Sequence, residues 1–386
     1  MLAQGVSAEP AAGDHSGSDN AAAATAGAAA AVARAVPVLE LYGCAALWPD
    51  PAEDAAFAEL LAEAKRRLVA HFGDALAVLN DTAQHEQMVA LPAVGLEALL
   101  ESDDFGTDSK SSVVLVLAEW MAVNFDSTDE VLWWRLYGLL RLVQCSRVYL
   151  SGVLPALHQR SPTSAASWFP LTLAEAFSML TYSLVSDPER KGMMAEGQLW
   201  NPCAGLATVP SGWRNTQPRC QCLPAEGRLF DFSASLAELE QSFGGLKPGE
   251  VGSLNPRVPG SRLGSFIVAQ GLAWQPSVQW TSDAATAGVY MYSRVPAALA
   301  ATGASAAEDK LLTEAVVALP PMRVSVRGAA GQEAWGGIKA LKLHEAAGNQ
   351  QPNASNSRSK LAACWAPYLQ GGTRLEGSIV LLLPTS

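Results

Sequence analysis

Apolar residues recur at three- and four-residue spacing through much of the first half of the chain, which is the spacing of one helix face. Residues 53–73 show it most clearly, with Phe57, Leu61, Ala64, Leu68 and Phe72 on one stripe. Gly73 follows where a glycine commonly ends a helix. The same spacing predicts further helices after Pro92, over 111–125 with Ser111 or Ser112 as its N-cap, from Asp129 to Val143, over 150–154, and over 170–184.

The pattern changes after Gly227 to short alternating or apolar runs between clusters of Gly, Pro and Ser. Strands of this length, separated by turn-forming residues, are typical of an antiparallel sandwich. The runs are RLFDFSA, GSFIVAQ, SVQWTS, AGVYMYS, MRVSVRG, GIKALKL and GSIVLLL. Two helices are expected to interrupt them, over 234–243 and over 306–319.

These patterns predict an α+β multidomain protein, in which an all-α helical domain is followed by an antiparallel β-sandwich. Four segments follow from them. Residues 1–36 are rich in Ala, Gly and Ser and cannot bury enough apolar surface to order themselves, so we expect a disordered tail. The other three are the helical domain over 37–160, a helix plus irregular linker over 161–226, and the β-sandwich over 227–386.

Charge and composition limit the partners and the compartment. The 386 residues carry 26 Lys and Arg against 37 Asp and Glu, a net charge of −11, whereas a nucleic-acid binder needs a basic surface. No apolar run reaches the roughly 18 residues of a membrane span, and the N-terminus lacks a basic targeting region. Six dispersed cysteines suit a reducing compartment. We therefore expect neither nucleic acid nor membrane as a partner, and a cytoplasmic protein with access to the nucleus.

The sequence contains none of the common catalytic or cofactor motifs that we sought. Walker, dinucleotide-binding, zinc-protease and nucleophile-elbow patterns are absent, and no histidine has a recognisable partner. Cys220 and Cys222 are separated by one residue, which does not match the usual spacing of zinc ligands. We expect no catalytic residue, no cofactor and no metal, and hence no enzymatic activity.

Four aromatic residues of the second half are candidate partner-binding residues, namely Trp274, Trp280, Tyr290 and Tyr292. Trp and Tyr are frequent anchors of protein interfaces. Strand alternation would put Tyr290 and Tyr292 on one face. Packing in the sandwich core is the favoured interpretation for all four, and partner binding is the alternative.

The basic cluster Lys65, Arg66 and Arg67 is the other candidate for partner binding. Its position late in the helix predicted within 53–73 suits the helix dipole, which favours cations near the C-terminus. A solvated helix face is the favoured interpretation of the cluster, and a docking patch is the alternative.

The helical stretch over about residues 55–157 resembles the BACK domain, which usually follows a BTB/POZ domain in adaptors of cullin-type ubiquitin ligases. The features that carry the resemblance are the turn Ser102-Asp103-Asp104, the helix Ser111–Met121 with Glu119-Trp120, the run Leu139–Val143, and Tyr149-Leu150 before Val153-Leu154-Pro155. The alanine-rich background resembles BACK-containing proteins of green algae. The resemblance implies a cullin scaffold or a BTB protein as a partner.

The segment from about Gly227 resembles the MATH (TRAF-like) β-sandwich. The features are Phe230-Asp231-Phe232, the step Gly271–Trp274, the run AGVYMYS, and the closing stretch from Tyr368. In this resemblance the sandwich would capture a protein substrate.

The BACK resemblance also implies a BTB domain ahead of the helices, and the residues before Ala55 do not have that pattern. We expect either a shortened gene model or a stand-alone BACK protein that borrows a BTB domain from another chain. The predicted function is a protein-interaction adaptor that recruits substrates to a cullin-RING ubiquitin ligase. The alternatives are a scaffold without a role in ubiquitination, and a ligand-binding or hydrolytic β-sandwich protein.

Overall fold

The structure is a computed structural model of a mixed α+β protein, with helices in its first half and antiparallel sheets in its second. It describes residues 36–147, 149–154, 169, 171–193, 209–282, 284, 286–299, 321–331, 333–336, 341–342 and 361–383. The predicted tail, apart from Val36, and the helix predicted over 306–319 lie outside these residues. None of the helices in the described ranges is both long enough and apolar enough to cross a bilayer.

Most of the predicted helices are present, at slightly different bounds. The α-helices are α1 (Pro37–Gly43), α2 (Ala55–Phe72), α3 (Ala75–Asn80), α4 (Thr82–Val89), α5 (Ala93–Glu101), α6 (Lys110–Asn124), α7 (Glu130–Gly138), α9 (Leu173–Leu184), α10 (Asp187–Met193) and α11 (Leu236–Phe243). The short turns are the 3-10 helices η1 (Ala45–Leu47), η2 (Phe125–Ser127), η3 (Leu142–Gln144), η6 (Ser211–Arg214), η7 (Ala297–Leu299) and η8 (Ala366–Tyr368), and the π-helix η4 (Tyr149–Val153).

Side-chain caps explain where several helices begin. The Asp54 carboxylate accepts the Phe57 N–H at the start of α2, and Gly73 ends that helix at a φ of 66°, which confirms the predicted helix and its stop. In α11, Ser235 and Glu238 form a reciprocal capping box, in which each side chain accepts a backbone N–H of the other residue. The helix predicted over 234–243 is thereby confirmed.

Two helix predictions need correction. Ser109, not Ser111 or Ser112, caps α6, because its hydroxyl accepts the Ser111 N–H. Nearly every residue of α6 up to Met121 is buried, so the helix has no exposed face over that length. The helix predicted from Asp129 to Val143 ends at Gly138, and the chain then makes the separate turn η3.

In the described ranges, ten strands form two five-stranded antiparallel sheets. The strands are β1 (Arg228–Ser235), β2 (Val251–Leu254), β3 (Ile267–Ala269), β4 (Leu272–Thr281), β5 (Thr286–Arg294), β6 (Met322–Arg327), β7 (Glu333–Gly336), β8 (Leu341–Lys342), β9 (Leu369–Gln370) and β10 (Arg374–Leu381). One sheet has the order β1-β10-β6-β7 with β9 on β10, and the other has the order β2-β4-β5-β8 with β3 on β4. Each run predicted as a strand contains one, and β2, β7 and β9 were not predicted.

Close packing within the first sheet depends on a glycine. Gly377 of β10 pairs with Phe232 of β1, and a Cβ on Gly377 would come within 2.2 Å of the Phe232 ring. The Phe232 ring therefore packs directly against the backbone of β10, and Phe232 is 1% exposed. Any larger residue at position 377 would displace that ring.

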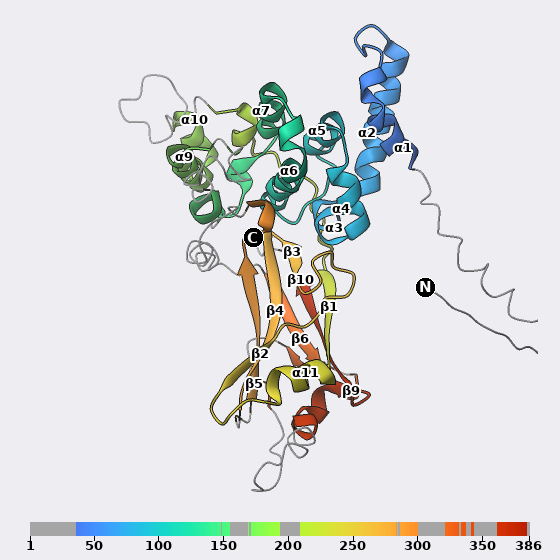
Figure 1. The fold of residues 1–386 in the computed structure, drawn as a ribbon. Coiled ribbons are helices and arrows are strands. Elements are labelled where there is room, and N and C mark those ends of the chain that lie inside the picture. The colour runs from blue at the N-terminus through green and yellow to red at the C-terminus, as the bar shows by residue number, and fades with distance from the viewer. Residues whose placement is uncertain are drawn as a thin grey trace, which may run out of the picture.

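The helices cover one end of the strands, and α11 lies at the other end (Figure 1). At the covered end α3 contacts β3, and α6 contacts η7. At the far end α11 contacts β1 and β2, which belong to different sheets.

Candidate functional site

Tyr290 and Tyr292 lie on the outer side of β5 and are not core residues. Their residues are 49% and 42% exposed, while the alternate residue Ala287 is 1% exposed. The interpretation that placed these tyrosines in the core is therefore wrong. Tyr292 is held in place by Gln279 of β4, whose Nε2 donates to the Tyr292 hydroxyl oxygen at 2.5 Å.

Trp274 and Trp280 lie on the opposite face of the same sheet. Trp274 is 1% exposed and donates its indole N–H to the Ala269 carbonyl oxygen at 3.0 Å. Trp280 pairs with Ala287 in the β4–β5 register, and its ring meets Phe243 of α11 edge-on at 5.9 Å. Trp274 is a core residue, as the favoured interpretation expected, and Trp280 is partly buried and packs against the core.

The outer face around the two tyrosines combines aromatic, amide and cationic groups. We call it the tyrosine face, made of Gln279 of β4 with Tyr290, Tyr292 and Arg294 of β5. Gln275 and Ser277 of β4 share this side of the sheet by register but are buried, at 5% and 1% exposed. The Arg294 guanidinium lies over the Phe266 ring at 5.3 Å from its centroid. Exposed tyrosines provide a large contact area, and their side chains lose little conformational entropy when a partner binds. Both properties are typical of residues at protein interfaces.

All three residues of the basic cluster on α2 form ion pairs with nearby carboxylates. Lys65 Nζ lies 2.5 Å from a Glu101 carboxylate oxygen, and Arg66 and Arg67 both pair with Glu63 of their own helix. The hydrogen bond from Arg67, followed by the charge of Arg66, lowers the pKa of Glu63. Every basic group of the cluster has a carboxylate partner, and the two arginines share one, so a single net positive charge remains. This arrangement fits a solvated helix face better than a docking patch.

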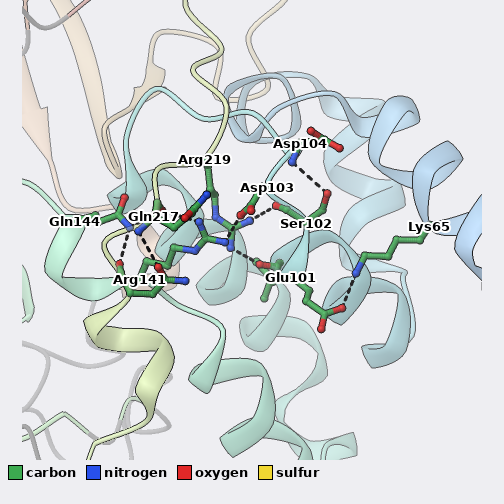
Figure 2. A network of polar contacts seen from close by, with 11 residues as sticks. Lys65, Glu101, Ser102, Asp103, Asp104, Arg141, Gln144, Gln217 and Arg219 are labelled. Atoms are coloured by element: carbon green, nitrogen blue, oxygen red, sulfur yellow. Dashed lines mark hydrogen bonds and ion pairs between the residues drawn. The ribbon is translucent and has the colours of Figure 1, made fainter.

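A polar network that the sequence did not reveal lies at the end of α5 (Figure 2). Arg219 donates to the carbonyl oxygens of Leu100 and Ser102, where α5 leaves its last carbonyls without helical partners. Arg141 lies beside it, forming an ion pair with Asp103 and donating to the Gln217 carbonyl oxygen at 2.7 Å.

The network fixes the segment 215–222 against the helices. Gln144 donates to the carbonyl oxygens of Asn215 and Gln217 at 2.6 and 2.7 Å, and the Cys220 N–H donates to the Asp103 carbonyl oxygen at 2.9 Å. This part of the predicted linker is irregular but firmly bound. Nothing local distinguishes Arg219 in the sequence, since its partners are more than a hundred residues away.

Electrostatics in the network follow from burial. Arg141 and Arg219 are 8% and 6% exposed. Burial, and then the charge of Arg141, lowers the pKa of Arg219 to about 10. The hydrogen bond from Arg141 lowers the pKa of Asp103. Arg141 therefore bonds a carboxylate, whereas Arg219 bonds carbonyl oxygens and feels the Asp103 charge without a hydrogen bond to it.

A second polar cluster joins the helices to the strands. Arg262 reaches from the loop before β3 to Glu119 of α6 at 3.3 Å, and His85 of α4 lies 3.2 Å from the other Glu119 oxygen. Burial pushes the pKa of Glu119 upward, but the hydrogen bond from His85 and the charge of Arg262 hold it below its usual value.

The turn between β3 and β4 inserts at the start of α6. Gln270 has a φ of 52°, and its N–H donates to the Asp108 carboxylate at 2.7 Å. The next N–H, of Gly271, donates to the Ser112 hydroxyl oxygen at 3.1 Å. A Cβ on Gly271 would lie 2.7 Å from the Ser111 carbonyl oxygen, so only glycine permits this approach.

In the described ranges no three His, Cys, Asp or Glu side chains come together in a way that could hold a metal ion. Cys220 is exposed and Cys222 is half-buried. Burial, followed by the nearby charges of Asp74 and Asp108, raises the pKa of Cys222.

Comparison of the chain with protein-family models, with curated proteins and with solved structures found no match.

Proposed function

We propose that this chain is a protein-interaction adaptor that recruits substrates to a cullin-RING ubiquitin ligase. The observation that carries the binding role is the exposure of Tyr290 and Tyr292 on one side of β5, at 49% and 42%. Large exposed aromatic side chains next to each other are uncommon on a surface without partners and are typical of interface anchors.

The occupant that we propose for the tyrosine face is an extended segment of a protein substrate. β5 pairs with β4 along most of its length, and with β8 only at Thr286 and Ala287 among the described residues. A partner strand could bind along the Tyr290–Arg294 part of β5 by backbone hydrogen bonds, with the tyrosines contacting its alternate side chains.

The helical part would contact the ligase scaffold. Its support is the resemblance of residues 55–157 to the BACK domain. We also propose a domain arrangement in which the BACK-like domain over 37–160 precedes a MATH-like β-sandwich formed by the two sheets. Buried residues on both sheets, such as Phe232 and Trp274, favour face-to-face packing.

Buried contacts between the two parts suit an adaptor. Asn80, Asp108 and Glu119 on the helical side are bonded to residues of the β3–β4 region. A substrate bound to the strands would then be held at a fixed orientation relative to the scaffold bound to the helices. We expect the protein to act in the cytoplasm, with access to the nucleus.

The test is affinity purification of the tagged full chain from its own cells, with blots for cullin and BTB proteins and mass spectrometry for substrates. We expect cullin or BTB proteins to co-purify with the wild type. The double variant Tyr290→Ala/Tyr292→Ala should retain them while losing substrate proteins that accumulate when the proteasome is inhibited.

Phe177→Ala provides the matched control, because this aromatic residue of α9 is 52% exposed and lies outside the tyrosine face. It should retain every partner. Absence of cullin and BTB proteins from the wild-type complex would contradict the ligase role. Equal substrate recovery with the double variant would contradict the tyrosine face.

A further inference from the structure

Three cationic side chains are buried together near the end of α5 and the start of α6. Lys110, Arg141 and Arg219 are 9%, 8% and 6% exposed. Burial lowers the pKa of Lys110 most, to about 8 together with the charges of Arg219 and Arg141, so the three charges act on one another. We call Lys110, Arg141 and Arg219 the cation cluster.

Lys110 differs from the two arginines in having no hydrogen-bond or ion-pair partner for its ammonium group among the described residues. Arg141 binds Asp103 and the Gln217 carbonyl oxygen, and Arg219 binds two carbonyl oxygens. A lysine that is nine-tenths buried normally has a partner, because burial of an unpaired charge is costly.

The position of Lys110 is unfavourable in two further respects. It is the first residue of α6, where the helix dipole presents positive charge and disfavours a cation. Asp103 is the carboxylate that pairs with the cluster, so three positive charges against one negative charge leave a formal charge of +2. The neighbouring thiol does not offset it, because burial raises the pKa of Cys145 to about 12.

Such an excess of buried positive charge, in a chain with a net charge of −11, is expected where an anion binds. We propose that the cation cluster is a binding site for a phosphate-type oxyanion. Arginine and lysine together suit this chemistry, since guanidinium groups offer paired donors and an ammonium group supplies a compact charge. The oxyanion would accept hydrogen bonds from Lys110 Nζ and from the guanidinium N–H groups that are not bonded to carbonyl oxygens.

The burial of the cluster favours a small anion over a protein segment. Asp103 lies between the cluster and solvent in exposure, with a side chain that is 53% exposed while that of Arg141 is 8% exposed. Bound there, the anion would bridge the start of α6 to Arg141 in the helical part and to Arg219 in the segment 215–222. The site is independent of the tyrosine face and of any role in ubiquitination.

The test is thermal unfolding of the full chain at pH 7 in increasing sodium phosphate, against sodium chloride at the same ionic strength. We expect phosphate to raise the unfolding temperature in a saturable way and chloride not to do so, because a ligand stabilises the state that binds it. Phosphorus NMR should show the resonance of inorganic phosphate broadening on addition of the protein. The same unfolding measurement is repeated with O-phosphoserine in place of inorganic phosphate. Stabilisation by phosphate alone indicates a free anion, and stabilisation by both indicates a phosphate group on a larger molecule.

The decisive variant is Lys110→Met, which removes the charge without leaving a partner unbonded. Without phosphate it should unfold at the same temperature as the wild type or higher. Its apparent affinity for phosphate should fall by about tenfold or more, the effect of one charge-assisted hydrogen bond. Lys247→Met, at an exposed lysine, is the control and should respond as the wild type does. The proposal is overturned if phosphate and chloride act alike on the wild type, or if Lys110→Met keeps the full phosphate response.

Discussion

Asn80 and Val268, 188 residues apart in the chain, exchange two hydrogen bonds between α3 and β3. The Asn80 amide nitrogen donates to the Val268 carbonyl oxygen, and the Val268 N–H donates to the Asn80 amide oxygen, each at 2.8 Å. Asn80 is 7% exposed and Val268 is 1% exposed, so water does not replace these bonds. The Asn80 side chain thus bonds both backbone polar groups of Val268, a buried residue of β3.

Asn80→Ala should therefore destabilise the protein strongly. It leaves the N–H and the carbonyl oxygen of Val268 buried without a partner, at about 1–3 kcal/mol each. We expect the free energy of unfolding in urea to fall by about 2–6 kcal/mol. Gln241→Ala, at an exposed position of α11, should change it by less than about 0.5 kcal/mol. Equal stability of the two variants would mean that the Asn80 contact is not made.

Asp108 should make the protein less stable as the pH rises through the weakly acidic range. Burial raises the pKa of this carboxyl from 3.8 to about 6, against the opposing hydrogen bonds from Ser112 and Gln270. Between these values the folded protein holds a proton that the unfolded chain has released, so the contribution of Asp108 falls with increasing pH. Two pKa units correspond to about 3 kcal/mol, fully expressed above about pH 6.

Asp108→Asn removes this titration and keeps an amide oxygen that can accept the Gln270 N–H. The free energy of unfolding of the variant, relative to the wild type, should rise between pH 4 and pH 7 by up to about 3 kcal/mol. Asp104→Asn, at an exposed residue of the same loop, is the matched control and should show no such rise. A flat difference for Asp108→Asn across this range would show that the carboxyl is ionised at low pH.

The periodicity of the sequence predicts elements whose two faces differ in exposure. Helix α2 has a clear apolar stripe and a terminal glycine, so its bounds could be predicted. Helix α6 is apolar on all sides from Val113 to Ala118, so its sequence identifies a helix but not a face. Strand β2, with the sequence VGSL, has neither alternation nor length, and its pairing with β4 alone defines it.

The candidate sites depend on contacts between distant residues, which local patterns do not encode. Alternation puts Tyr290 and Tyr292 on one face of β5, but the register with β4 and the packing of Trp280 decide that this face is the outer one. Likewise Arg141 and Arg219 are 78 positions apart, and only tertiary packing brings both to Asp103.

Truncation of Trp274 should destabilise the protein strongly, whereas truncation of Tyr290 should leave its stability nearly unchanged. Trp274 is 1% exposed, so Trp274→Ala leaves a cavity in the core and should lower the free energy of unfolding by about 3–5 kcal/mol. Tyr290→Ala, at a 49% exposed residue, should change it by less than about 0.5 kcal/mol. Urea denaturation measures both values. A large loss of stability with Tyr290→Ala would assign Tyr290 to the core and remove it from the tyrosine face.

Cysteine alkylation should distinguish the buried Cys145 from the exposed Cys220, which both lie near the polar network. Cys145 is buried, and a pKa raised to about 12 by that burial leaves on the order of one thiolate in 10⁴ at pH 8. Cys220 is exposed, as is Cys44 of the helical part. Because the thiolate is the nucleophile, iodoacetamide should label Cys44 and Cys220 at least about a hundredfold faster than Cys145. Peptide mass spectrometry over time measures the rates, and the urea-unfolded chain is the control in which all three should react alike. Native Cys145 reacting as fast as Cys220 would mean that the start of α6 is open to solvent, and that the cation cluster is not buried.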